Sequence, residues 1–549
     1  MTDTWTWATV TQASPLRIKV DGDTTALDAT TDNLVGSLAV DDRVRVHLHS
    51  DGIIVTGLQG GAGGALAAVE SAAKDRARIE RLMQATGARV AVGRRGDDYD
   101  LYQEISAGVW WKIALGYTTT SGNAHHSLEA ASIGRTVLTV AAADGSFVYS
   151  ATGWATSSNA GSFAGLYTKN STTGQSFTWT TPSATMVGLR AFRATNGGYA
   201  LAEVDGDVTR ATLLPTAQEE VNAGRLASTA LVANGGTLNP TDRLYDSYGF
   251  GPPAYDDVIP FAQGLTEATH TITLTVTGYK RTASTDVRLY LSGGVYADAS
   301  TSPATAGVTN WPLATLNDTG SVYEYAITYR RDGRTLTEWV GNRHGSEVET
   351  SFTIAVDGVT RSLADGEIVT ASIVQVSRTT NLSNPDNAAE VIATGSLTWS
   401  LTPQNALDVA YSIDWTVPGR VYTSYIAMYP TAGNILDKGR VCGGQDVTLT
   451  ADDGSANGNT RSDSTVMWNS GGKAAVMLTV RNLGEAVGSW RDSGDRSMWI
   501  EDRLGGSVNK VYVQRVGSPQ NTPVDSGVAW DVRLNYRAAW LPSASIIGD

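Results

Sequence analysis

The segment Thr271-Ile-Thr-Leu-Thr-Val-Thr277 alternates hydroxyl and aliphatic side chains with a period of two. This alternation is typical of a β-strand that buries one of its faces. Short strands of the same kind recur, for example at 136–140, 176–180 and 475–480, and almost no helical period interrupts them after residue 88. Strands in series without intervening helices predict a mainly β protein, built from serial β-sandwich domains of the jelly-roll type.

The size and composition of the chain agree with a folded protein of several domains. At about 150 residues per domain, its 549 residues predict three or four domains. Hydrophobic residues make up 41% of the chain and charged residues only 17%, which excludes an intrinsically disordered chain and a highly charged helical rod. The net charge of −14 leaves no basic face for phosphate contacts, so we expect no nucleic-acid partner. There is no run of about 18 apolar residues and no signal-peptide pattern, so we expect synthesis in the cytoplasm and no membrane insertion.

The order of patterns along the chain predicts six segments. The N-terminal residues contain short alternating strands and Asp-Gly turns, and together they have the size of an OB-like barrel. The predicted segments are an OB-like barrel at 1–58, a Gly-rich linker at 59–64, a coiled-coil neck at 65–87, a β-hairpin connector at 88–117, a jelly roll at 118–297 and a C-terminal β-sandwich region, either one large or two small sandwiches, at 298–549.

The helical segment has the spacing of a coiled coil. Side chains at alternating intervals of three and four residues form one seam, which consists of Val69, Ala72, Arg76, Ile79 and Met83. This is the a/d rhythm of helices that pack against one another, and Gly87 is expected to end the helix after residue 86. Because the seam contains Ala and Arg, a lone helix would be marginally stable, so we expect an oligomerisation neck. A single amphipathic linker helix is the alternative.

No catalytic motif stands out in the sequence. Asp246, Asp256 and Asp257 lie in an aromatic-rich loop with Tyr248 and Tyr255. A pair of carboxylates about 5–9 Å apart is what cleavage of a glycosidic bond requires. The same residues are typical of a long loop with turn-forming Asp. We therefore predict no catalytic residue and no enzyme activity, with a polysaccharide depolymerase as the alternative.

Few residues suit a metal ion. His47 and His49 lie one strand period apart, without a third ligand nearby in the sequence. Asp/Asn/Gly clusters at 452–459 and 492–495 offer oxygen ligands for Ca²⁺, but they lack the spacing of an EF-hand. A single cysteine, Cys442, allows neither a disulfide within the chain nor a Cys-based zinc site. We predict no cofactor and no metal, with Ca²⁺ as the alternative.

Aromatic residues point to carbohydrate. Nine of the fifteen Trp follow residue 298, which is more than one hydrophobic core needs. Flat rings stack on the apolar faces of sugars, while polar neighbours bind the hydroxyl groups. The segment 338–347 combines both kinds of group, so its candidate carbohydrate-binding residues are Trp339, Asn342, Arg343, His344 and Glu347, with weaker candidates at Trp154, Tyr248 and Tyr255. The alternative is that Trp339 belongs to the core and the rest of the segment is a polar turn.

The first sixty residues resemble the N-terminal OB-like domain of minor tail proteins from siphophages that infect actinobacteria. The residues that carry the resemblance are Trp7–Thr11, Ser14–Asp23, Asn33–Val46 and Ile53–Leu58. The order of N-terminal domain, Gly-rich joint, short coiled coil and β-rich distal part is also similar to that family, and the excess of Arg over Lys fits a GC-rich host. The resemblance implies a homotrimer at the tail tip of a virion, where residues 1–58 dock to tail-tip or baseplate proteins and the distal sandwiches contact the host surface.

The region from about 130 to 297 resembles galactose-binding-like jelly rolls. The stretches 198–206 and 264–280 carry this resemblance. Such domains bind glycans in many proteins and serve as spacers in others. Together the two resemblances imply a tail fibre or minor tail protein that binds a host cell-wall glycan outside the cell, and a purely structural tail component is a further alternative. No site residue is transferred from either family.

Overall fold

The computed structural model of the chain is mainly β, as the alternating patterns predict. It describes residues 4–13, 16–21, 24–25, 31–33, 43–49, 52–59, 63–119, 122–150, 153–249, 254–317, 325–334, 338–341, 347–384, 387–433, 435–450, 454, 456–458, 462–482, 498–502, 508–516 and 521–548. Helices α1 (Gly63–Leu82) and α2 (Ala217–Asn222) are the α-helices of these residues. No helix in this part of the chain combines the length and apolar character needed to span a bilayer.

The N-terminal unit is a five-stranded sheet with the strand order β2-β1-β4-β5-β3. Its strands are β1 (Thr4–Ala13), β2 (Leu16–Val20), β3 (Thr31–Asn33), β4 (Arg43–His49) and β5 (Gly52–Gln59). The pair β3–β5 is parallel and the other neighbouring strands are antiparallel. In β2, Ile18 and Val20 are buried whereas Arg17 and Lys19 are exposed, so the period-two pattern sets which face is covered.

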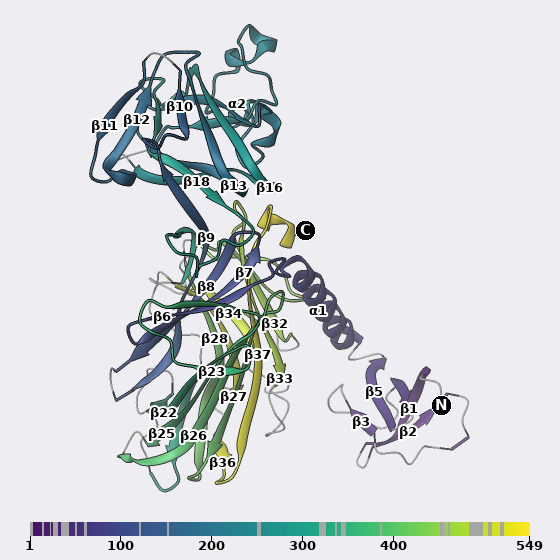
Figure 1. Cartoon of the computed structure of the whole chain (residues 1–549). Coiled ribbons are helices and arrows are strands. Elements are labelled where there is room, and N and C mark those ends of the chain that lie inside the picture. Colours follow the sequence, from purple (N-terminus) through teal and green to yellow (C-terminus); the bar gives the residue numbers. More distant parts are fainter. Residues whose placement is uncertain are drawn as a thin grey trace.

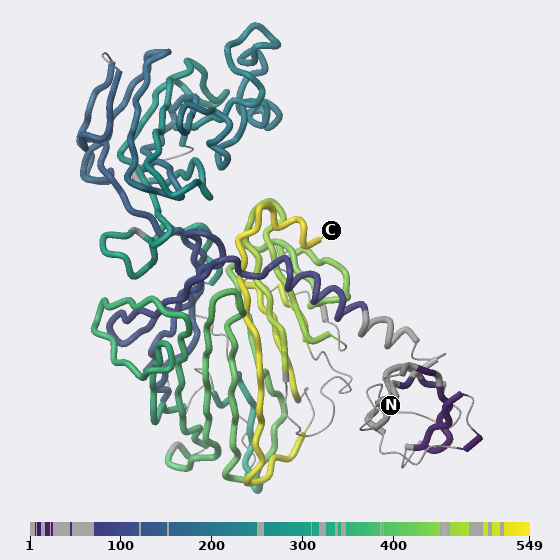
Figure 2. Tube along the Cα trace, turned by 45° about the vertical axis from the view of Figure 1, so that its right-hand side comes forward, coloured from purple at the N-terminus to yellow at the C-terminus, as the bar shows by residue number. Residues whose placement is uncertain are grey.

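Helix α1 ends earlier than predicted. The predicted helix reaches residue 86, but α1 ends at Leu82. The N–H of Thr86 donates to the carbonyl of Ile105 at 3.0 Å, so the chain has already joined a strand at that point. A Cβ atom at Gly87 would lie 2.0 Å from the carbonyl oxygen of Glu104, so this close approach requires glycine. The helix therefore stops where the chain enters a sheet, and Figure 2 shows α1 between the N-terminal unit and the rest of the protein.

The C-terminal half forms a sandwich of two antiparallel sheets, which we call the main body (Figure 1). The ten-stranded sheet has the order β23-β22-β25-β26-β27-β37-β33-β32-β29-β30. In chain order, its strands are β22 (Glu347–Val356), β23 (Val359–Arg361), β25 (Val374–Asn384), β26 (Asn387–Leu401), β27 (Leu407–Trp415), β29 (Lys438–Val441), β30 (Val447–Thr448), β32 (Ser464–Trp468), β33 (Ala474–Asn482) and β37 (Ala529–Trp540). The seven-stranded sheet has the order β21-β20-β28-β35-β34-β31, with β36 beside β28, and contains β20 (Ala326–Arg331), β21 (Glu338–Val340), β28 (Gly419–Ala432), β31 (Ala456–Gly458), β34 (Met498–Asp502), β35 (Val508–Val516) and β36 (Thr522–Val524).

Aromatic side chains join the two sheets of the main body. Tyr429 of β28 meets Tyr536 of β37 edge to face, with ring centroids 5.2 Å apart. Tyr329 of β20 stacks on Trp415 of β27 at 5.3 Å. All four side chains belong to one large hydrophobic core, so the two sheets pack face to face.

A third sheet of twelve strands runs from the main body into a separate unit, the upper domain (residues 142–297; Figure 1). Its strands are β6 (Val90–Arg95), β7 (Asp98–Ser106), β8 (Val109–Thr118), β9 (His125–Ala141), β10 (Phe147–Tyr149), β13 (Ser176–Arg193), β14 (Gly198–Val204), β15 (Leu244–Asp246), β16 (Ala254–Lys280), β18 (Gly293–Ala297), β19 (Thr309–Asn317) and β24 (Ile368–Ala371). The upper domain also holds a three-stranded sheet of β11 (Ala155–Ser158), β12 (Leu166–Asn170) and β17 (Leu289–Leu291).

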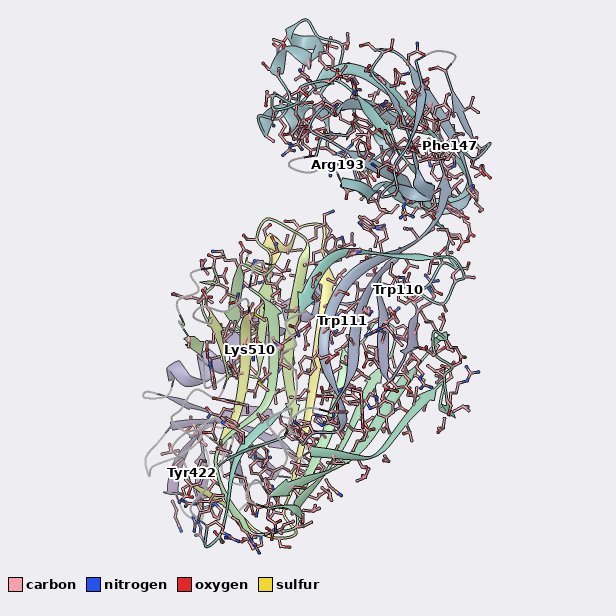
Figure 3. All side chains as sticks on the ribbon, turned by 90° about the vertical axis from the view of Figure 1, so that its left-hand side faces the viewer. Trp110, Trp111, Phe147, Arg193, Tyr422 and Lys510 are labelled. Atoms are coloured by element: carbon pink, nitrogen blue, oxygen red, sulfur yellow. The ribbon has the colours of Figure 1, made fainter. Side chains whose placement is uncertain are left out.

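The predicted hairpin at 88–117 is part of the main body and not a separate connector. Leu101, Trp111 and Ile113 are buried in the same hydrophobic core as Trp399 and Val513. The upper domain has its own core, in which Phe147 stacks on Trp179 with ring centroids 5.3 Å apart (Figure 3 labels Phe147). The boundaries of these cores therefore differ from the predicted boundaries after residues 117 and 297.

Strand β9 connects the main body with the upper domain. Its residues from His125 to Arg135 pair with β8 in the main body. Its last residues, from Leu138 to Ala141, pair with β18 of the upper domain. Strand β19 returns along β9 between Ala131 and Val137. Strand β9, of 17 residues, thus belongs to both units, and other contacts, such as the hydrogen bond from Arg135 to Gln263 at 3.0 Å, also join them.

Candidate aromatic binding face

Four aromatic side chains lie in a row on one face of the seven-stranded sheet. They are Trp339 of β21, Tyr425 of β28, Tyr512 of β35 and Trp499 of β34, and we call them the aromatic row. Trp339 stacks on Tyr425 with ring centroids 5.5 Å apart and an interplanar angle of 17°. Tyr425 lies 4.9 Å from Tyr512, which stacks on Trp499 at 5.1 Å. The four rings therefore touch in sequence across the sheet, and the stacking of Trp339 on Tyr425 spans the intervening strand β20.

The alternation of side chains places the aromatic row on the outer face of the sheet. Val511 and Val513, on either side of Tyr512, belong to the main core. Met498 and Ile500 flank Trp499 in the same way, and Val340 follows Trp339. Because successive residues of a strand point to opposite faces, the rings point away from the core. Trp339, Tyr425 and Tyr512 are half-buried, whereas Trp499 is 8% exposed.

Polar groups accompany the aromatic row. Lys510 and Gln514 lie two residues before and two residues after Tyr512, so they point to the same face as its ring. On the same sheet, the Arg330 guanidinium lies 4.8 Å from the ring centre of Tyr422. Figure 3 labels Lys510 and Tyr422 on the main body, and Arg193 and Phe147 on the upper domain. Gln514 is only 6% exposed, so the half-buried Lys510 is the more accessible of the two. Ring faces beside a cationic side chain suit a sugar, which needs both stacking and hydrogen bonds.

Glu347, a predicted binding residue, is instead completely buried. Its Oε1 atom accepts hydrogen bonds from the Tyr325 hydroxyl at 2.8 Å, the Thr380 hydroxyl at 2.9 Å and the Arg378 guanidinium at 3.1 Å. Glu347 and Arg378 are 0% and 2% exposed. A carboxylate that is fully buried and held by three donors serves the fold, and it cannot reach a ligand on the surface.

His125 lies beside this buried network and makes stability depend on pH. Burial lowers the pKa of its imidazole below the ordinary value of 6.5, with Glu347 acting in the opposite direction. The unfolded chain therefore takes up a proton that the folded chain does not, and we expect stability to fall as the pH drops below about 6.5. Thermal unfolding of the native chain and of His125→Gln from pH 8 to pH 5 measures this. Between pH 8 and pH 5, the melting temperature of the native chain should fall further than that of the variant. An equal fall in both chains would contradict the prediction.

Of the other predicted binding residues, the two whose side chains are described, Trp154 and Tyr248, lie in the upper domain and not in the aromatic row. Asn342, Arg343 and His344 lie outside the described residues, and so does the side chain of Tyr255. Trp154, in the upper domain, is half-buried against Tyr149 and Phe177, and its indole N–H donates to the Ser150 hydroxyl at 3.2 Å. Tyr248 is 6% exposed, with the Arg281 guanidinium 5.3 Å from its ring centre. Trp154 and Tyr248 therefore take part in packing within the upper domain.

The carboxylates considered for catalysis have arginine partners. Asp246 contacts Arg281 at 2.5 Å and accepts a hydrogen bond from the backbone N–H of Tyr248 at 2.9 Å. Burial nevertheless raises the pKa of Asp246. Asp257 pairs with Arg193 at 3.3 Å, and the side chain of Asp256 lies outside the described residues. These ion pairs link the strands of the upper domain.

The surplus of Trp is smaller than the sequence suggests. Trp399, Trp415, Trp468 and Trp530 are each at most 2% exposed. Trp399 and Trp415 belong to the main core together with Trp530. Three of the nine Trp thus fill the main core, because two wide sheets enclose a long core that accommodates large rings, and Trp468 is buried in a separate cluster.

Metal ligands do not gather anywhere in the described part of the chain: it holds no group of three or more His, Cys, Asp or Glu side chains suited to an ion. The cluster at 492–495 falls outside the described residues, as do Asp452 and Asp453 of the other predicted cluster. The side chains of His47 and His49 also fall outside them, although both residues belong to β4.

Three members of the aromatic row escaped prediction from the sequence. Tyr425, Trp499 and Tyr512 are each followed by an aliphatic side chain of the main core, which is a local sign of an outward ring. That sign does not reveal that β21 and β28 belong to one sheet with the consecutive strands β34 and β35, because β21, β28 and this pair are far apart in the chain. No protein-family model matches the chain, and no curated protein matches it either.

Proposed function

We propose that this protein is a phage tail fibre or minor tail protein that binds a host cell-surface glycan through the aromatic row. The aromatic row carries the proposal, because it offers four connected rings with polar neighbours on the outer face of a sheet. Aromatic rings suit the apolar faces of sugars, and the strands beneath them keep the rings in place before the ligand arrives. Receptor binding therefore belongs to the main body.

The attachment role rests on the N-terminal residues. Their resemblance to tail-protein domains is supported by a five-stranded sheet with a single parallel pair, which suits a partly open OB-like barrel. In this proposal residues 1–58 dock to tail-tip or baseplate proteins, and α1 forms a homotrimeric coiled-coil neck. The upper domain is a galactose-binding-like jelly roll. Three weak glycan sites on one trimer then reinforce one another through their effective concentration.

The proposal is tested with the full-length chain and purified cell walls from a panel of actinobacteria. Fluorescently labelled protein should sediment with the walls of susceptible strains, and soluble wall polysaccharide should compete. Release of reducing ends during the incubation would instead support a depolymerase. If the protein neither sediments with any wall nor releases reducing ends, the receptor role is removed from the proposal. A purely structural tail component then remains.

A further inference from the structure

The predicted seam of α1 already has a partner within the same chain. Ala72, Ile79 and Met83 are 3%, 0% and 2% exposed. Ile79 and Met83 pack into a hydrophobic cluster of the C-terminal residues. We call this cluster the docking surface; it consists of Cys442, Val466, Trp468, Ala475, Met477, Ala539, Leu541, Ala544 and Ile547. The seam is therefore covered by the main body, and the side chain of Val69 lies outside the described residues.

The charged residues beside the seam are also engaged. With Ala72 and Ile79 at d positions, Asp75 falls at g and Glu80 at e, the positions that form ion pairs between the helices of a coiled coil. Asp75 instead pairs with Arg440 at 3.5 Å, and Glu80 pairs with Arg481 at 2.6 Å. Within the seam itself, Arg76 forms an ion pair with Asp463.

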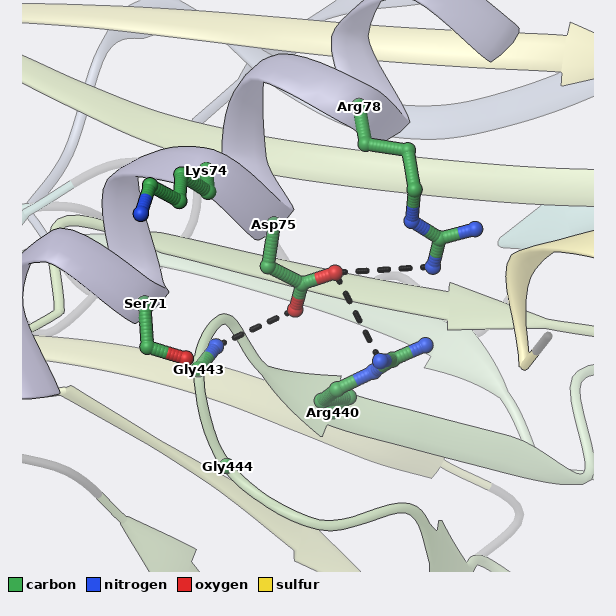
Figure 4. Close-up of a pocket in the computed structure, with 7 residues that line it drawn as sticks. All are labelled: Ser71, Lys74, Asp75, Arg78, Arg440, Gly443 and Gly444. Carbon is green, nitrogen blue, oxygen red and sulfur yellow. Dashed lines mark hydrogen bonds and ion pairs between the residues drawn. The ribbon is translucent and has the colours of Figure 1, made fainter.

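The loop after β29 is shaped to fit α1. Gly443 has a φ of 80°, and its N–H donates to Asp75 at 3.1 Å (Figure 4). A Cβ atom on Gly443 would lie 2.8 Å from the Cα of Ala72, so only glycine lets the loop approach the helix this closely. Further along the helix, Arg78 donates to the carbonyl of Ile547 at 2.6 Å. The helix is therefore fitted to the docking surface by apolar contacts, ion pairs and backbone shape together.

We propose that α1 is a releasable helix: it is docked on its own chain in the free protein, and it leaves the docking surface to pack against the α1 helices of two further copies in the trimer. The inference rests on the trimeric neck of the proposed function. Ala72, Ile79 and Met83 of the seam are buried in the free chain, and Asp75, Arg76 and Glu80 form ion pairs with the main body. One helix cannot present these side chains to the main body and to two further copies at once. Docking thus delays trimer formation until α1 is released.

Cys442 reports on the state of α1. It is the only cysteine of the chain, it is 0% exposed, and it lies in the docking surface with Ile79 and Met83. Burial also raises the pKa of its thiol above the ordinary value, which keeps the reactive thiolate scarce while the helix is docked. A maleimide should therefore label Cys442 slowly in the docked state and fast in the released state.

Asp463→Arg is the variant that tests the proposal, because it leaves the sequence of α1 unchanged. It places a second cation opposite Arg76, so we expect labelling of Cys442 about tenfold faster than in the native chain. Light scattering should show a larger fraction of particles with three times the chain mass of 57.9 kDa. The double variant Arg76→Asp with Asp463→Arg restores the ion pair and should label slowly again.

Asp414→Arg is the matched control. Asp414 is an exposed residue of β27 in the same main body, and the variant makes the same charge change away from the docking surface. It should leave the labelling rate and the particle mass as in the native chain. A trimer in which Cys442 is as protected as in the monomer would overturn the inference, and so would faster labelling of Asp463→Arg without more trimer.

The outcomes separate the inference from the proposed function. A chain that stays monomeric in every variant removes the trimeric neck and overturns the inference with it. A chain that trimerises on release but does not bind any cell wall supports the releasable helix and removes only the receptor role.

Discussion

Replacing Trp339 with alanine is expected to weaken binding of the full-length chain to host cell wall by about 30-fold. Truncating an aromatic anchor in a binding site costs about 2 kcal/mol, and about 1.4 kcal/mol corresponds to a tenfold change in affinity. Trp339 stands at one end of the aromatic row and is half-buried. Its neighbour Val340 is the residue that belongs to the main core, so the substitution removes ring surface and leaves the core filled.

Related substitutions separate the ring from its polar neighbours. Tyr512→Ala should weaken binding to a similar degree, because its ring connects Tyr425 with Trp499. Trp339→Phe keeps an aromatic ring and should retain most of the affinity. In a trimer each substitution is present three times, so the loss measured on intact cell walls should exceed the loss measured with a soluble oligosaccharide. Sedimentation with walls and calorimetry with oligosaccharides provide the two values.

Trp154→Ala is the matched control for this series. It also removes a half-buried Trp, but one that packs against Phe177 in the upper domain. We expect wall binding to be unchanged, with circular dichroism confirming that each variant is folded. Loss of binding in Trp154→Ala together with normal binding in Trp339→Ala would place the receptor site in the upper domain. Normal binding in both would mean that the aromatic row does not bind the receptor.

Replacing Glu347 with alanine is expected to lower the free energy of unfolding of the main body by about 3–5 kcal/mol. The substitution leaves the Arg378 guanidinium buried without the carboxylate that neutralises it, and breaking a buried ion pair in this way carries a cost of about that size. The Tyr325 hydroxyl and the Thr380 hydroxyl lose their acceptor as well. Urea unfolding followed by Trp fluorescence suits the measurement, because Arg378 lies 5.4 Å from the ring centre of Trp399.

Two further variants identify the source of this loss. Glu347→Gln keeps the shape of the side chain but not its charge, so it should be destabilising to a similar degree. Thr380→Val removes one hydrogen bond and no charge, so it should cost only about 1 kcal/mol. A cost of Glu347→Ala no larger than that of Thr380→Val would show that the charge contributes nothing. Folded Glu347 variants should still bind cell wall, because the carboxylate is enclosed.

The sequence predicts the type of structure better than the partners of its elements. Alternation in Thr271–Thr277 correctly predicts a strand, since a two-residue period has no other simple explanation. The seam of α1 predicts packing against other helices, and its residues Ala72, Ile79 and Met83 are buried within the same chain. It does not say what covers them, because the same apolar stripe suits other helices and the docking surface equally well.

The binding residues show the same limit. Trp339 and Glu347 lie in one short polar segment, yet one points away from the core and the other is enclosed within it. Composition cannot separate them, because the difference arises from the strands that each residue pairs with. Buried Glu347 depends on Arg378 and Tyr325, and Trp339 depends on Tyr425, none of which is its neighbour in the chain.

The arrangement of β18 and β19 beside β9 has a consequence for how the upper domain can be exchanged during evolution. Because β18 and β19 both pair with β9, the chain leaves the main body and returns to it at neighbouring points. The residues between these points, with their separate core, form an insertion whose ends are close together. Insertions of this kind can be exchanged as a unit, since a different domain with equally close ends fits the same two points without altering the host core. Recombination at these two points would therefore replace the upper domain in one step and leave the aromatic row, the docking surface and the N-terminal unit as they are.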